Sequence, residues 1–322
     1  MSTSDRHSQA TAEARDLLRW RSPLRTELWA SRLASGFGVD PLDDEAFLQS
    51  LGDDPGQEAA LTLVALAAIS SPEAAAATPP PKKPAPTWTT RLTQATNDGA
   101  WYGKADPYGE QTLAALSFHY ANAKEPHVLV VAIDQANGGL AVDAVVEEPK
   151  FLTDLRLSPA DPATVAGRVL DAFDLTHTIL GAPAADTLSA VRALALSRTR
   201  AIPDPVRHAH DDTAATLDAL PAAPGAAEAF AAVKDFLGDR PLWWSPSRAS
   251  RFLTSWLPRE ATLSAEAITA MPAVLRAWTE THTDEQHADK ILRQIDADAP
   301  KLAGLMADES LAGLRKRLSQ QE

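Results

Sequence analysis

The sequence predicts a mainly α-helical α+β protein, and three observations point to this fold class. Two apolar, β-branched runs flank an Asn-Gly turn within residues 127–146, which is the strongest short-range signal for a β-hairpin. Apolar residues at helical spacing dominate most of the remaining chain. A proline-rich run at 71–87 separates an early helical region from the hairpin. We therefore expect a small antiparallel three-stranded meander covered by helices, with an N-terminal and a C-terminal helical module.

The composition limits the classes of function. The chain of 322 residues has 45% hydrophobic and 23% charged residues, which is typical of globular proteins. Its formal net charge of -13 argues against a protein that binds nucleic acids or anionic membranes non-specifically, because both need clustered Lys and Arg. The chain has no cysteine, which excludes disulfides, Cys-ligated metals and thiol nucleophiles. We expect no bound cofactor.

No targeting signal is recognisable near the N-terminus. Residues 1–16 are polar and lack an apolar core followed by a small-residue cleavage site, so the sequence predicts a cytoplasmic protein. The longest apolar stretch, 59–70, is too short to span a membrane and is predicted to be a buried helix.

The N-terminal helical module, residues 1–70, is predicted from periodic apolar residues. Leu24, Leu28, Trp29 and Leu33 supply much of one buried helix face. Prolines and glycines interrupt the pattern and predict helices at 10–20, 23–35, 43–51 and 57–69. The next segment, 71–87, contains a Pro-Pro-Pro-Lys-Lys-Pro run that favours extended polyproline II and is predicted to be an exposed linker.

The central domain, residues 88–201, carries the predicted sheet. Its strands are expected at 111–120, 127–134 and 139–147. Two amphipathic segments, 162–175 and 185–200, are the helices expected to bury the apolar face of this sheet. His119 and His127 lie on neighbouring predicted strands and could approach each other, as half-buried histidines that hydrogen-bond a neighbour.

The C-terminal helical domain, residues 226–322, follows a proline-rich connector at 202–225. Ser245 is expected to cap a helix that has Pro246 in its first position and ends before Pro258. The same rules predict helices at 226–237, 246–257, 265–270, 272–281, 285–297 and 310–320.

The order of several segments resembles a known group of proteins. A Tyr-Gly-Glu segment at 108–110 precedes the apolar run from His127, a Gly-Gly turn and Val142-Asp143, and WSPSRASRFLTSWLP and PAVLRAW follow far downstream. Over residues 88–278 this pattern resembles a group of uncharacterised conserved proteins of actinobacteria. The resemblance implies no particular activity. A lysine often precedes the aspartate in that group, whereas Val142 stands there in this chain, so any role of that lysine is absent.

His208, His210 and Asp211 form the most metal-like cluster in the sequence. In an extended segment the two imidazoles would point to the same side, and nitrogen with oxygen suits zinc or another divalent transition ion. No second group supplies an obvious base, and a solvated loop between prolines explains the same residues. No metal site is therefore assigned.

Asp134, Glu148 and Lys150 resemble the array in which two carboxylates hold magnesium and a lysine steadies the attacking water of a nuclease. Pro149 would break the strand that must carry Glu148 and Lys150, and Asp134 is better explained as a turn residue. A metal-dependent hydrolase or nuclease is thus an alternative function, and no catalytic residue is assigned.

The function expected first is a non-catalytic adaptor that binds a protein partner, because separate helical modules joined by a spacer suit recruitment. Trp243, Trp244 and Trp256 are the candidate partner-binding residues, although an aromatic helical core explains them equally. A DNA-associated regulator that uses the C-terminal helices is a further alternative, although nucleic-acid binding is not expected from the charge.

Overall fold

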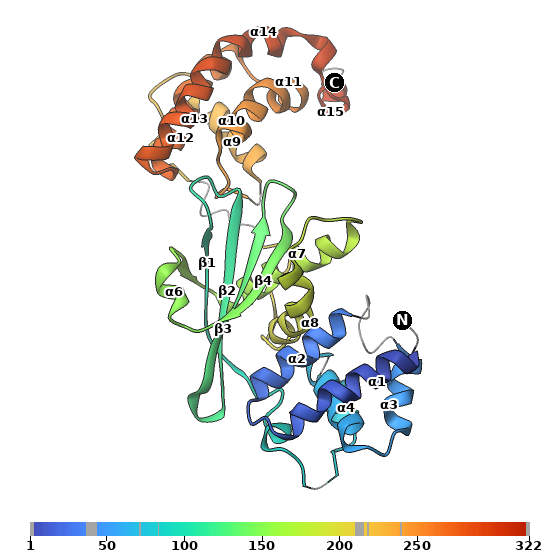
Figure 1. Ribbon diagram of the computed structural model, residues 1–322. Helices are drawn as coiled ribbons and strands as arrows, with labels where there is room; N and C mark the ends of the chain where they lie inside the picture. Colours follow the sequence, from blue (N-terminus) through green and yellow to red (C-terminus); the bar gives the residue numbers. More distant parts are fainter. Residues whose placement is uncertain are drawn as a thin grey trace. The chain divides into compact units, whose positions relative to one another are not determined.

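The computed structural model describes residues 3–36, 44–70, 72–82, 84–209, 216–217, 219–238 and 240–319. The chain divides into two compact units (Figure 1). The first unit contains Met1–Tyr102, Leu113–Asp134 and Gly139–His208, and the second contains Gly103–Thr112, Gln135–Gly138 and Ala209–Glu322. The N-terminal helices and most of the sheet therefore belong to one unit.

The antiparallel sheet has five strands in the described part of the chain, in the order β4-β3-β2-β1-β5. The strands are β1 (Thr96–Lys104), β2 (Gln111–Tyr120), β3 (Lys124–Asp134), β4 (Leu140–Glu147) and β5 (Ser158–Ala160). The predicted meander corresponds to β2, β3 and β4. The predicted number of three strands was wrong, because β1 contains Asn97, Asp98 and Gly99, which are poor strand formers, and β5 is a short edge strand with Pro159.

The turn between β3 and β4 explains why the hairpin signal is strong. Gly138 and Gly139 adopt φ values of 102° and 93°, which side chains disfavour. The Gly139 N–H donates to the Asp134 carbonyl at 2.7 Å, and Asp134 pairs with Leu140 across the ladder. Glycine at these positions thus closes the turn and sets where the two strands begin to pair.

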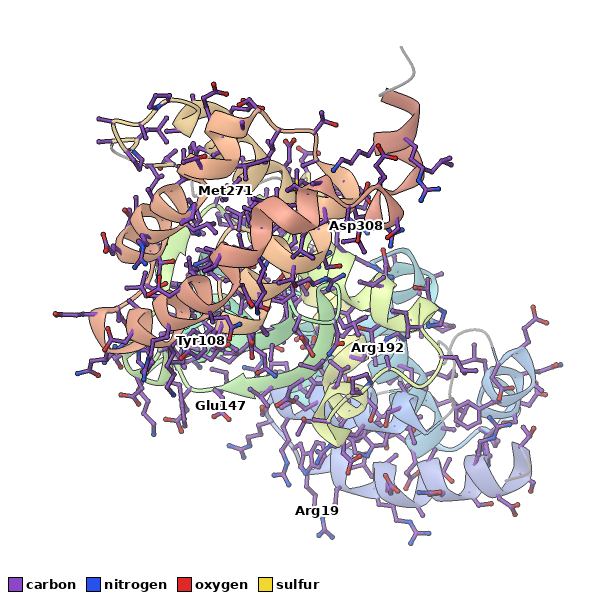
Figure 2. All side chains as sticks on the ribbon, turned by 90° about the horizontal axis from the view of Figure 1, so that it is seen from above. Arg19, Tyr108, Glu147, Arg192, Met271 and Asp308 are labelled. Carbon is purple, nitrogen blue, oxygen red and sulfur yellow. The ribbon has the colours of Figure 1, made fainter. Side chains whose placement is uncertain are left out.

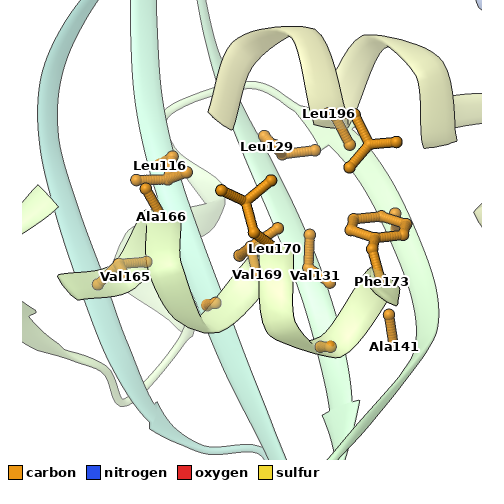
Figure 3. Packing of buried hydrophobic residues seen from close by; sticks show 14 of the residues in the cluster. Leu116, Leu129, Val131, Ala141, Val165, Ala166, Val169, Leu170, Phe173 and Leu196 are labelled. Atoms are coloured by element: carbon orange, nitrogen blue, oxygen red, sulfur yellow. The ribbon is translucent and has the colours of Figure 1, made fainter. Parts of the chain in front are cut away.

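Each face of the sheet is covered by helical segments. One face lies under α7 (Pro162–Thr178) and α8 (Asp186–Arg200), the two predicted cover helices. Figure 3 shows strand and helix side chains meeting in this core: Leu116, Leu129, Val131, Val169, Leu170 and Phe173. The other face packs against leucines from the segment that begins with α6 (Phe151–Asp154). Alternate strand residues are therefore buried on both sides.

The N-terminal helices of the first unit share a further core with α8. Their bounds are α1 (Thr3–Ala14), α2 (Pro23–Ser35), α3 (Glu45–Asp53), α4 (Gln57–Ser70) and α5 (Pro72–Ala77), with 3-10 turns at Arg15–Leu18 and Thr87–Thr90. Ser22 caps α2 by accepting a hydrogen bond from the Arg25 N–H at 2.9 Å. Helix α4 is buried along most of its length, as predicted.

The predicted linker at 71–87 lies inside the first unit. It begins with the short helix α5, so its first part is helical and not extended. Trp88, directly after it, is fully buried, and its Nε1 donates to the Leu17 carbonyl at 2.9 Å. The chain that follows the prolines is thus attached to the N-terminal helices.

The second unit is helical in the described residues after the connector. Its helices are α9 (Ala226–Leu237), α10 (Pro246–Arg251), α11 (Leu257–Glu260), α12 (Ala265–His282), α13 (Glu285–Asp298), α14 (Leu302–Ala307) and α15 (Leu314–Ser319). The Ser245 hydroxyl accepts from the Arg248 N–H at 3.3 Å and caps α10, with Pro246 in the first turn, as predicted.

Two prolines lie within helical structure where the sequence predicted breaks. A π-helical turn, Phe252–Trp256, joins α10 to α11, and the chain continues as helix through Pro258. Helix α12 runs without interruption through Pro272, although an internal proline costs about 3 kcal/mol. Burial of apolar side chains on both sides of Pro272 offsets this cost, because each contributes about 1.5–3 kcal/mol: Met271, Val274, Leu275 and Trp278.

A segment from the sheet region completes the second unit. The Trp244 N–H donates to the Tyr108 carbonyl at 2.8 Å. Gly109 has a φ of +67°, and a Cβ there would lie only 2.2 Å from the Leu242 carbonyl oxygen. Glycine is therefore required where residues 103–112 pass close to the chain near Trp244.

None of the helices in the described part of the chain combines the length and apolarity that a bilayer crossing needs.

Candidate functional site

The interface between α2 and α8 brings together the charged residues of the first unit. Glu27 of α2 pairs with Arg198 of α8, and one turn further along α2 the Ser31 hydroxyl accepts from the Leu194 N–H at 3.2 Å. A step forward on α2 thus corresponds to a step backward on α8. The two helices run antiparallel, and both the ion pair and a pocket lie along them.

Glu27, Tyr120 and Arg198 form a buried network, here called the Glu27 cluster. Glu27 is fully buried, and 4% of the surface of Arg198 is exposed. Arg198 Nη2 pairs with Glu27 Oε2 and donates to Tyr120 Oη at 2.6 Å, while Tyr120 Oη donates to Glu27 Oε2. The other carboxylate oxygen accepts from the Thr93 N–H at 3.1 Å. Each oxygen of Glu27 therefore has a donor, as a buried carboxylate requires.

Burial and the neighbouring groups shift the pKa values of Tyr120 and Arg198. Burial, reinforced by the Glu27 carboxylate, raises the pKa of the Tyr120 phenol, which stays protonated and donates. Burial lowers the pKa of Arg198, but the attraction of the neighbouring Glu27 raises it by more. The pKa of Arg198 therefore lies above its ordinary value. Arg198 therefore keeps its positive charge in the core, next to Glu27.

His127 lies beside the Glu27 cluster. Only 2% of its surface is exposed, and its ring lies 5.9 Å from that of Phe118 and 5.7 Å from that of Tyr120. Its Nδ1 contacts the Glu125 carbonyl at 2.8 Å, where a protonated nitrogen donates. Burial lowers the pKa of His127 to about 4, so the ring is neutral at neutral pH. His119 lies on the opposite strand face and contacts Asp98, so the two histidines do not meet.

A pocket of about 310 Å³ opens between α2, α4, α7 and α8, and is here called the α8 pocket. Its apolar wall includes Ile69, Phe173 and Leu196, of which at most 8% is exposed. Its volume falls at the small end of the range for small-molecule sites. None of the Glu27 cluster residues lines it, although the cluster and the pocket share α2 and α8. The cluster therefore fixes the helices that form the pocket.

The polar lining of the α8 pocket is basic. Arg192, Arg200 and His177 line it, and its described lining includes no Asp or Glu. Neither guanidinium forms an ion pair with a carboxylate in the described part of the chain. Arg192, labelled in Figure 2, is partly buried, whereas Arg200 and His177 lie exposed at the rim. The pocket is thus a local concentration of positive charge in an acidic protein.

Most hydroxyl groups that line the α8 pocket donate to the backbone, whereas the Ser31 hydroxyl accepts from the Leu194 N–H. Ser70 donates to the Leu66 carbonyl at 2.9 Å, and Thr176 donates to the Ala141 carbonyl at 3.0 Å. Ser189 donates to the Asp186 carbonyl at 2.8 Å. These hydroxyls have therefore used their protons and offer acceptor lone pairs, which leaves the arginines as the main donors to a ligand.

A second cavity, of about 480 Å³, lies along α1 and α2. Arg6 and Arg32 line it together with Glu13 and Asp16, so its charges are mixed. Arg6 pairs with Asp44 at 2.6 Å, and Trp29 Nε1 donates to Glu13 at 3.3 Å. Arg6 and Glu13 thus have partners of their own. Because its lining carries both signs of charge, this cavity selects a ligand charge less clearly than the α8 pocket does.

The residues of the nuclease-like array are not brought together. Asp134 pairs with Leu140 at the turn end of the β3–β4 hairpin, whereas Glu147 pairs with Val128 at the other end. Glu148 follows Glu147, so it lies about 20 Å from Asp134 along the strands. Lys150 forms an exposed ion pair with Glu148 at 2.7 Å. The antiparallel register separates the two carboxylates, and they cannot share one metal ion.

The metal-like histidine cluster is only partly described, because His210 and Asp211 lie outside the described residues. His208 is exposed, and its backbone N–H donates to Asp171 at 2.7 Å. Arg207 contacts the same Asp171 at 2.6 Å. Among the described residues, no group of three or more His, Asp and Glu side chains is placed to hold a metal ion.

The candidate partner-binding tryptophans contribute to the core of the second unit. Trp244 is fully buried, and its Nε1 donates to the Thr279 hydroxyl at 2.9 Å. Trp243 and Trp256 are partly buried. The Arg248 guanidinium lies 4.1 Å from the ring centroid of Trp243, and Trp256 stacks on Phe252 at 5.6 Å. Their main contacts are therefore internal.

The sequence did not single out the residues of the Glu27 cluster or of the α8 pocket. Glu27 lies three residues after Leu24, on the predicted buried face, where a lone carboxylate implies a buried cation. Arg192, Leu196 and Arg200 are spaced by four residues on a helix predicted to be buried. These signals were present, but the partners come from segments distant in sequence.

Comparisons with known protein families, with curated proteins and with solved structures gave no match to this chain.

Proposed function

We propose that this protein is a binding protein and that its first unit holds an anionic ligand with an apolar body in the α8 pocket. The observation that carries this proposal is the pairing of a partly buried, uncompensated Arg192 with a wall of buried apolar side chains. A partly desolvated guanidinium gains most from an anion that binds it directly. The apolar wall contributes in proportion to the ligand surface that it removes from water.

The charge of the chain supports an anion that is held by short-range contacts. A formal net charge of -13 repels anions at long range, but salt screens this repulsion beyond about 8 Å at physiological ionic strength. Within the α8 pocket the nearest charges are Arg192 and Arg200. A ligand must therefore be selected by direct hydrogen bonds and apolar contacts, and not by electrostatic steering.

Calorimetric titration of the full chain with decanoate in low-salt buffer tests the proposal. We expect saturable binding that weakens about tenfold when Arg192→Gln removes the charge, as the loss of one charge-assisted interaction implies. Arg19→Gln is the matched control, because Arg19 is an exposed arginine outside the pocket. Equal weakening by both substitutions would contradict the proposal, and so would the absence of binding both of decanoate and of the other apolar anions tested below.

The protein-binding adaptor role, the cytoplasmic location and the resemblance to actinobacterial proteins stay predictions. The adaptor prediction came from separate helical modules joined by a spacer, and exposed tryptophans would have strengthened it. Trp244 is buried, and Trp243 and Trp256 pack on neighbours within the second unit. The α8 pocket is therefore the better-supported binding site.

A further inference from the structure

We infer that the ligand of the α8 pocket carries two anionic groups, one at each end of an apolar spacer. This inference rests on the proposed function and names the class of ligand. It follows from the positions of Arg192 and Arg200, which line the same pocket from the same helix.

The two arginines are too far apart to act as one charge. They are eight residues apart on α8, which places their Cα atoms about 12 Å apart along the helix axis at a rise of about 1.5 Å per residue. Leu196 lies midway between them and also lines the pocket. The pocket therefore presents a cation, an apolar surface and a second cation in order along α8.

The middle of the pocket excludes charge. Ile69 from α4 and Phe173 from α7 line the same pocket as Leu196, and all three are buried. An anionic group placed among them would be desolvated without a partner, at a cost of several kcal/mol or more. The ligand is thus expected to be apolar between its charged ends.

His177 extends the cationic end at Arg192. Helix α7 ends at Thr178 and α8 begins at Asp186, so the short connection brings His177 to the N-terminal half of α8. Its imidazole lines the pocket and can donate a hydrogen bond to the same anionic group as Arg192. This end is the more enclosed one, because Arg200 is exposed.

A straight-chain dicarboxylate satisfies all of these features. One carboxylate meets Arg192, the chain crosses the apolar middle, and the other carboxylate meets Arg200. A cavity of about 310 Å³ accommodates such a chain but not a protein helix. A single phosphate head group is the competing arrangement, in which both arginine side chains bend toward one anion.

Calorimetric titration of the full chain with decanedioate, decanoate and decyl phosphate distinguishes these arrangements. We expect decanedioate to bind about threefold more tightly than decanoate, because its second carboxylate forms an exposed ion pair with Arg200. Arg192→Gln is expected to weaken decanedioate binding about tenfold. Arg200→Gln is expected to weaken it about threefold, because an exposed ion pair contributes less. Arg19→Gln is the control, and thermal unfolding of each variant verifies the fold.

The effect of each substitution on decanoate gives the sharper readout. A monoacid held by the enclosed end loses affinity when Arg192 is replaced and keeps it when Arg200 is replaced, so only the diacid responds to both. If decanoate binds as tightly as decanedioate, or if decyl phosphate binds best and loses affinity with either substitution, the two-ended ligand is overturned while the proposed function stands. If none of the three probes binds, the proposed function itself fails.

Discussion

Arg198 in the first unit and Arg248 in the second are buried to the same degree, with 4% and 5% of their surfaces exposed, but different groups compensate their charges. Arg198 pairs with the carboxylate of Glu27 and the hydroxyl of Tyr120, from a helix and a strand distant in sequence. Arg248 donates to the backbone carbonyls of residues close to it, at Phe236, Leu237, Arg240 and Trp243.

The difference shows that a buried arginine can hold distant elements together or close a local segment. Arg198 joins α8 to α2 and to the sheet, and its ion-pair partner is the side chain of Glu27 on α2. Arg248 satisfies carbonyls at and after the C-terminal end of α9, where helix carbonyls lack internal partners. Loss of Glu27, the partner of Arg198, should therefore destabilise the whole first unit, whereas loss of Arg248 should destabilise only one end of α9.

The largest effect is expected for Glu27→Gln. It leaves the Arg198 charge buried without a counterion, which destabilises proteins by about 3–5 kcal/mol. The measurement is the free energy of unfolding of the first-unit transition in urea. Replacement of both partners, Glu27→Leu with Arg198→Leu, should restore much of that free energy, since apolar substitutes for buried pairs are often neutral. A double variant as unstable as Glu27→Gln would show that the charge is not the cause.

The next effect is a pH dependence from His127. Because the folded chain holds this ring neutral with a pKa of about 4, the unfolded chain binds the proton first as the pH falls below about 6.5. The free energy of unfolding should decrease as the pH falls from about 6.5 to about 4, by about 3 kcal/mol at most. Above about pH 6.5 the ring is neutral in both states, so it adds no pH dependence there. The measurement is the free energy of unfolding in urea at several pH values across this range. Plotted against pH, it should have a shallower slope for His127→Gln than for the unmodified chain. Equal slopes would contradict the burial of a neutral ring.

Arg248→Met should destabilise the second unit by about 2 kcal/mol, because it leaves several carbonyl groups without their charged donor. The loss should be local. Hydrogen exchange is expected to quicken near the C-terminal end of α9 and in the Arg240 to Trp244 segment, and to stay unchanged in the first unit. Arg248→Lys retains a single charged donor group, so its stability should lie between that of Arg248→Met and that of the unmodified chain. Faster exchange throughout the sheet would remove the distinction between the two arginines.

The smallest effect is expected for Trp244→Phe. It keeps an aromatic ring in the core but removes the hydrogen bond from Nε1 to the Thr279 hydroxyl, which contributes about 1 kcal/mol. A double-mutant cycle with Thr279→Val isolates this term. A coupling energy near zero would show that the tryptophan stabilises the second unit through packing alone.

The elements that could be predicted are those whose cause is local. The Gly-Gly turn, the Ser245 cap with Pro246 and the apolar run of α4 each depend on neighbouring residues, and each was located to within a few residues. Strand β1 was missed because its sequence disfavours a strand, and pairing with β2 and β5 forms it nevertheless. Helix α12 continues through Pro272 because of burial, which no local rule contains.

The candidate site could not be predicted for the same reason. Glu27, Tyr120 and Arg198 are separated by 93 and 78 residues, so no short motif contains two of them. The lining of the α8 pocket comes from four helices, and only the spacing of Arg192 and Arg200 was visible in one segment. The nuclease-like array shows the converse case. Its residues are close in sequence, but the antiparallel register puts them at opposite ends of one hairpin.

The discontinuous second unit has a consequence for the order of events during synthesis. Residues 103–112 leave the ribosome long before Trp244, whose N–H the Tyr108 carbonyl accepts. At a synthesis rate of about 5–20 residues per second, the donor of that carbonyl is synthesised on the order of 10 s later. During this interval Tyr108 and Gly109 lack the chain near Leu242 and Trp244, against which they pack in the second unit. A chain truncated after His208 should therefore contain every residue of the first unit, while the earliest segment of the second unit remains open to proteases.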